Sequence, residues 1–208
     1  MRSNCWAKSL EPEYYGKVEF LYEAEERERQ KILKMLEIAG KMVSDYFGKK
    51  CDYDILVCDG GWCMEVQTIS RERGGSEYRL HDIKYLAMTD YDLQEIIIRK
   101  DIAKFAQYLH EMIHCIIPKS YPQQLREGLA WYFTLEIMKP YPYLRPNYPN
   151  WVADIYINPV RSLVETFGLD FIKQFVAGKA EIEESAIPED AKDLFLPEEV
   201  FFRKKKFY

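Results

Sequence analysis

Apolar and polar positions repeat with helical spacing in the first part of the chain. Over residues 22–47, apolar side chains recur every three or four positions, and the first half of this segment is highly charged. This pattern predicts one long amphipathic helix. Gly48 follows directly and is a suitable residue to end it.

Shorter runs with the character of strands come next. Residues 52–59 and 62–69 are separated by Gly60 and Gly61, which indicates a hairpin or another tight connection. Residues 77–90 are ambiguous, and we expect a strand over part of them. Residues 93–100, LQEIIIRK, contain three consecutive β-branched isoleucines and are predicted to form a strand.

Helical spacing returns in the second half of the chain. It predicts a helix over residues 102–117, with Asp101 as its N-cap and Pro118 preventing its continuation. Further helices are expected at 125–138, 159–168 and 169–180.

The order of these elements predicts an α+β fold in a single domain, residues 1–208. Its N-terminal lobe, residues 1–118, would contain the long helix, a small mixed β-sheet and the helix at 102–117. Its C-terminal lobe, residues 119–208, would be helical and end in an acidic, then aromatic and basic tail whose aromatic residues look exposed.

Composition narrows the class of protein. Of the 208 residues, 48% are apolar and 30% are charged, as in ordinary soluble domains, and the net charge of −5 argues against bulk binding to nucleic acid or to an anionic membrane. No apolar stretch is long enough for a transmembrane helix, and the N-terminus lacks the pattern of a signal peptide. We therefore expect a cytoplasmic protein. Its five cysteines are expected to be reduced and mostly buried, rather than a disulfide framework or a zinc knuckle.

The segment HEMIH carries the strongest chemical signal. His110 and His114 lie one helical turn apart on the same face, so both imidazoles can reach a single ion at Zn–N distances of about 2.0–2.1 Å. Glu111 lies about 100° around the helix. There it can stand beside the metal without binding it, where a base for an activated water is needed. The competing interpretation is a pair of buried histidines beside a salt-bridged glutamate, which does not account for the spacing.

A catalytic zinc ion usually keeps three protein ligands, so one ligand must come from elsewhere. The extended pattern H-E-x-x-H-x-x-G-x-x-H is excluded because Ile117 and Ser120 stand at its glycine and last histidine. His81 is the remaining histidine, but we interpret it as a surface or strand residue. Glu127 is the preferred third ligand, since a short loop would fold the next helix back so that its start faces the two histidines. Glu127 could instead be an acid favoured by the helix dipole, and Glu136 is a weaker rival ligand.

The pair of motifs HEMIH and REGLAWYF resembles the gluzincin metallopeptidases, especially the compact peptidase-MA-like group. The resemblance covers about residues 90–180 and is specific only at the two motifs. It implies a zincin-like fold with a thermolysin-like catalytic core, in which the glutamate of Glu-Gly-Leu-Ala, here Glu127, is the third zinc ligand. It also implies that strand 93–100 is the edge strand that binds extended peptide.

The chain departs from thermolysin-like members in three respects. The loop before Glu127 is shorter, Trp131 stands where many members have an aspartate, and no downstream histidine is present to stabilise an oxyanion. Tyr156 fits the corresponding segment best and is the expected oxyanion donor, although a packing role would be ordinary for an aromatic residue.

The predicted function is a Zn²⁺-dependent metallopeptidase that acts on a peptide or protein substrate, with Glu111 as general base and Tyr156 assisting. The alternative is a latent or inactive zincin-fold protein that serves as a regulatory or protein-binding module, with the tail docked in the cleft or on a partner. A relative of the repressor-cleaving metallopeptidases is disfavoured, because their third-ligand motif differs and no helix-turn-helix segment is evident.

Overall fold

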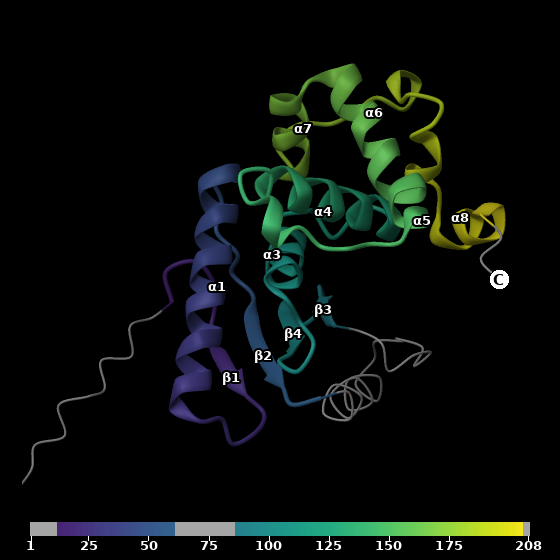
Figure 1. Cartoon of the computed structure of the whole chain (residues 1–208). Coiled ribbons are helices and arrows are strands. Elements are labelled where there is room, and N and C mark those ends of the chain that lie inside the picture. Colours follow the sequence, from purple (N-terminus) through teal and green to yellow (C-terminus); the bar gives the residue numbers. More distant parts are fainter. Residues whose placement is uncertain (1–11, 61–85, 206–208) are drawn as a thin grey trace, which may run out of the picture.

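The structure, a computed structural model, describes residues 12–60 and 86–205 (Figure 1). Within this part of the chain, four strands form a mixed sheet in the order β1-β2-β4-β3. The strands β1, β2 and β4 run parallel, and β3 is antiparallel to β4. Their bounds are Val18–Phe20 for β1, Asp54–Cys58 for β2, Ala87–Asp90 for β3 and Glu95–Arg99 for β4.

The strand β4 confirms the predicted strand at 93–100, but its expected position at the edge of the sheet is wrong. It pairs with β2 on one side and with β3 on the other. Residues Ile96, Ile97 and Ile98 are fully buried. Ile96 and Ile98 belong to the large hydrophobic core, whereas Ile97 packs with Leu56 and Cys58 in a second, smaller cluster. The sequence did not predict the short strand β1, and β3 occupies the end of the ambiguous segment 77–90.

Two helices pack together beside the sheet. The helix α1, Glu26–Phe47, confirms the predicted long helix and ends at Gly48, whose φ of 66° lies in the left-handed region that glycine adopts readily. The helix α3, Phe105–His114, lies against α1 and also contacts β3 (Figure 1). The larger of the two hydrophobic clusters among the described residues joins these elements, so α3 is held on one side by α1 and on another by the sheet.

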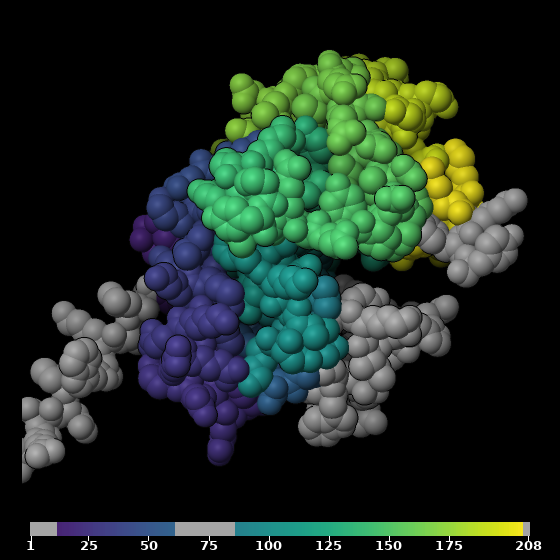
Figure 2. All heavy atoms as spheres, in the orientation of Figure 1, coloured from purple at the N-terminus to yellow at the C-terminus, as the bar shows by residue number. Residues whose placement is uncertain are grey.

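The second half of the described chain is helical. Figure 2 shows its green residues lying directly against teal residues of the chain, with the yellow residues beside the green ones. The predicted helices at 125–138, 159–168 and 169–180 are confirmed with shifted ends. The helical elements are α4 (Gln123–Ile137), α5 (Asn150–Val152), a π-helical turn (Ala153–Ile157), α6 (Asn158–Phe167), α7 (Leu169–Val176) and α8 (Glu198–Lys205).

The tail is not a free segment. Its helix α8 buries Phe201 completely, and the Phe201 ring stacks on that of Tyr156 with 6.2 Å between the centroids. The side-chain amide of Gln124 on α4 also donates a hydrogen bond to the carbonyl of Leu196. The expectation of exposed tail aromatics is therefore wrong for Phe201, which belongs to the hydrophobic core.

The cysteines differ from expectation in one respect. Cys51, Cys58 and Cys115 are buried as predicted, but Cys51 and Cys115 form a disulfide with 5.3 Å between their Cα atoms. The prediction of reduced cysteines is wrong for this pair, which is separated by 64 positions and brought together only by tertiary packing. The other two cysteines, like His81 and the predicted strand at 62–69, lie outside the described residues. No helix in the described ranges combines the length and the apolar character needed to cross a membrane.

Candidate metal centre

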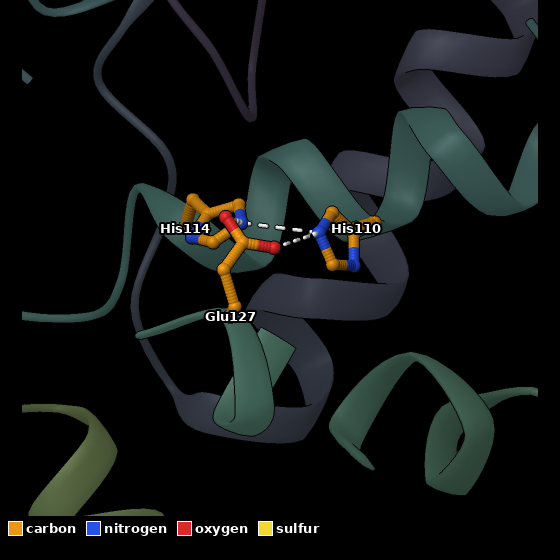
Figure 3. A group of neighbouring side chains, drawn as sticks. All are labelled: His110, His114 and Glu127. Atoms are coloured by element: carbon orange, nitrogen blue, oxygen red, sulfur yellow. Dashed lines mark hydrogen bonds and ion pairs between the residues drawn. The ribbon is translucent and has the colours of Figure 1, made fainter. Parts of the chain in front are cut away.

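The helices α3 and α4 bring the three predicted ligands together (Figure 3). His110 and His114 project from one face of α3, and both are buried. The chain then turns through a short loop, and α4 begins after Pro122. Glu127 extends from α4 toward the two imidazole rings (Figure 3). A short loop therefore folds α4 back against α3, as the sequence predicted, and brings Glu127 to the two histidines.

The distances between the three side chains are nearly equal. The Nε2 atoms of His110 and His114 lie 3.1 Å apart. The Glu127 carboxylate places Oε2 at 3.5 Å from Nε2 of His110 and Oε1 at 3.4 Å from Nε2 of His114. Tetrahedral ligands at about 2.0–2.1 Å from an ion are separated by about 3.3 Å. This group of side chains could therefore hold a metal ion.

The charges of the cluster are unevenly distributed. Burial disfavours the charged form of His110, but a hydrogen bond to Glu127 and the charges of Glu111 and Glu127 raise its pKa. Burial lowers the pKa of His114 to about 3. Burial acts to raise the pKa of Glu127, yet the two imidazoles and Arg126 outweigh it and lower that pKa to about 2. Glu127 is thus a carboxylate and His114 a neutral imidazole, which are the protonation states that bind metal, whereas at His110 the raised pKa makes a metal ion compete with a proton.

Glu111 lies beside this cluster but is not one of its three members. Its Oε2 atom accepts a hydrogen bond of 2.6 Å from Thr89 Oγ1 on β3. Burial raises the pKa of Glu111 to about 7, although His110 and Thr89 oppose the shift. A carboxylate whose pKa is near neutrality is suited to taking up and releasing a proton in this pH range.

This pKa leads to a prediction for the metal-free protein. The folded protein binds the Glu111 proton more tightly than the unfolded chain does. Protonation of Glu111 therefore stabilises the folded state fully below pH 4.5, and this stabilisation is lost as the pH rises through about 7. Glu111→Gln is therefore expected to stabilise the metal-free protein relative to wild type by about 2 kcal/mol more at pH 8 than at pH 5. Urea unfolding in the presence of a chelator measures this difference. The same change at exposed Glu165 on α6 is the control and should produce no such difference; an equal effect there would contradict the assignment to Glu111.

Other side chains surround the two imidazoles. The hydroxyl oxygen of Tyr91, which follows β3, lies 2.8 Å from Nδ1 of His114. The ring of Trp131 on α4 lies 4.7 Å from that of His110 between centroids. The Nδ1 atom of His110 is buried and has no hydrogen-bond partner among the described residues. The two imidazoles thus have different outer environments, one polar and one aromatic.

Tyr156 is near the cluster but is not bonded to it. It lies in the π-helical turn at Ala153–Ile157, a backbone irregularity that is frequent at functional sites. Burial raises the pKa of its hydroxyl, and the nearby charge of Glu127 raises that pKa further. A Cβ atom at Gly128 would lie 3.1 Å from the Tyr156 carbonyl oxygen, so glycine here permits the close approach of the turn to α4.

The structure thus gathers His110, His114 and Glu127 and places Glu111 and Tyr156 around them. The rival ligand Glu136 lies deeper in α4, where it pairs with Lys139. The sequence analysis did not identify Thr89, Tyr91 or Arg126 as neighbours of the site. Only Arg126 had a local signal, because it directly precedes Glu127. Comparisons with models of protein families, with curated proteins and with solved structures found no significant match.

Proposed function

We propose that the protein is a zinc metallopeptidase of the gluzincin type with a zincin-like fold. The observation that carries this proposal is the convergence of His110, His114 and Glu127, whose ligand atoms all lie within 4.8 Å of one another. Two imidazoles and one carboxylate form the ligand set of catalytic zinc in several peptidases, and that set leaves one position open. The helical H-E-x-x-H segment and its resemblance to gluzincins add support for peptide hydrolysis.

Zn²⁺ held by these three side chains would supply Lewis-acid chemistry, lowering the pKa of a water molecule and polarising a peptide carbonyl. Glu111 would accept a proton from the attacking water and deliver it to the leaving amine. The hydroxyl of Thr89 keeps the Glu111 carboxylate beside the cluster through its hydrogen bond. The general base is thus held by β3, while both histidines belong to the same helix as the base.

Tyr156 is the proposed donor to the developing oxyanion. Its pKa is raised, so the hydroxyl keeps its proton at neutral pH and can donate it in a hydrogen bond. The packing of Phe201 against its ring and the close approach of its backbone to Gly128 hold this residue in place. The predicted strand at 93–100, which is β4, lies inside the sheet, so it has no free edge to bind a peptide substrate.

Metal analysis combined with a hydrolysis assay tests the proposal. Purified protein is expected to bind stoichiometric zinc and to hydrolyse a fluorescent casein substrate. A chelator should abolish hydrolysis, and added zinc should restore it. Stoichiometric zinc without hydrolysis of casein or of a peptide library would instead favour the alternative, an inactive zincin-fold binding module. Absence of bound zinc from metal-supplemented protein would refute the zinc peptidase. Truncation of the tail is a poor test, because it removes the buried ring of Phe201.

A further inference from the structure

The hydroxyl of Tyr91 contacts Nδ1 of His114, the ring nitrogen that does not face the other two ligands. The Tyr91 hydroxyl lies 2.8 Å from Nδ1, while Nε2 of the same ring faces His110 and Glu127. An imidazole that uses Nε2 as a ligand carries its proton on Nδ1, and the partner of that proton sets both the tautomer and the orientation of the ring. Tyr91 is placed to be this partner.

The position of Tyr91 is itself fixed from three sides. The guanidinium of Arg126 lies over its ring at 4.1 Å from the centroid, and the ring of Tyr53 meets it edge-on at 6.3 Å. Asp90, which is buried, accepts hydrogen bonds from the backbone N–H groups of Asp92 and Leu93 and so shapes the turn that carries Tyr91. Tyr91 is thus held by contacts to its ring and by hydrogen bonds within its turn.

Contacts across the site link this turn to the segment between the two ligand helices. Asp92 forms an ion pair with Lys119 in the loop that joins α3 to α4. Arg126 donates a hydrogen bond of 3.2 Å to the carbonyl oxygen of Lys119, and it directly precedes Glu127. The same first turns of α4 therefore position one ligand, Glu127, and brace the residue that contacts another ligand, His114.

We propose that Tyr91 is a positioning residue of the metal centre, which holds His114 with its proton on Nδ1 and Nε2 directed at the ion. This inference rests on the metal site of the proposed function but not on peptide hydrolysis. His110 has no such partner among the described residues, so its Nδ1 atom provides an internal contrast. Loss of the Tyr91 hydroxyl should weaken metal binding without removing a ligand.

The test compares Tyr91→Phe with Tyr15→Phe, since each removes one hydroxyl and keeps the ring, and the Tyr15 hydroxyl donates to the carbonyl oxygen of Leu33 rather than to the cluster. Zinc affinity, measured by competition with a chromophoric chelator, is expected to fall by about 10- to 100-fold in Tyr91→Phe and to stay at the wild-type value in Tyr15→Phe. Circular dichroism and thermal unfolding of the metal-free variants check that both are folded. An unchanged zinc affinity in folded Tyr91→Phe would overturn the inference.

A spectroscopic readout separates positioning from a general structural effect. Only three histidines are present in the chain, so their ring nitrogens can be assigned individually in long-range ¹H–¹⁵N spectra. In the zinc-loaded wild type, His114 is expected to show a slowly exchanging Nδ1 proton, which Tyr91→Phe should lose and Tyr15→Phe should keep. A His114 ring protonated on Nε2 in that state would contradict the proposal. Neither measurement uses catalytic activity, so a zinc-binding protein that lacks peptidase activity would refute the proposed function and leave this inference standing.

Discussion

Replacing Glu111 with Gln is expected to lower kcat for peptide hydrolysis by about 10²- to 10⁴-fold while zinc remains bound. The amide cannot accept the proton of the attacking water, and it has no proton to return to the leaving amine. Zinc should remain because Glu111 is not one of the three clustered side chains. The amide oxygen can still accept the hydrogen bond that Thr89 donates to Oε2, so the local packing should persist.

A second variant distinguishes a missing base from a disturbed site. Glu111→Asp keeps the carboxylate but withdraws it by one methylene, and activity between that of the wild type and that of Glu111→Gln is expected. Zinc content is measured for all three proteins together with kcat. Wild-type kcat in the Gln variant would refute Glu111 as the base, whereas loss of zinc from that variant would show that Glu111 supports the ligands instead.

Features set by local sequence could be predicted well. The 3.6-residue periodicity identified α1, α3 and α4, and Gly48 marked the end of α1. The two histidines are one turn apart in any helix, so their convergence needed no tertiary information. The placement of Glu127 needed only one further assumption, that a short loop reverses the chain between α3 and α4.

Features set by contacts between distant segments could not be predicted in the same way. The three residues of β1 are too few to produce a periodic signal, and the interior position of β4 depends on its pairing with both β2 and β3. Tyr91 reaches His114 across 23 positions, and Thr89 reaches Glu111 across 22. Neither spacing reflects a helical or strand period, and in a chain with 16 tyrosines no local pattern distinguishes the one that meets a ligand.

Replacing Glu127 with Ala is expected to abolish both zinc binding at micromolar metal and peptidase activity. The variant keeps the two histidine ligands of α3 but loses the only carboxylate that the described structure places within 4.8 Å of both of them. Zinc affinity should fall by more than the roughly 10- to 100-fold typical of an outer-shell change, and hence by more than in Tyr91→Phe. Isothermal titration or competition with a chromophoric chelator measures the loss.

Glu136→Ala is the matched control, because Glu136 lies on the same helix and was the rival ligand, yet its carboxylate bonds to Lys139. If Glu127 were only a helix-dipole acid, Glu127→Ala would lower stability slightly, and zinc affinity would be unchanged in both variants. If it is a ligand, only Glu127→Ala should lose the metal, and in the metal-free state the pKa of His110 should also fall, because its hydrogen-bonded anion is gone. Zinc bound at wild-type affinity by Glu127→Ala would therefore refute the three-ligand site, and with it the chemical role assigned to Glu111.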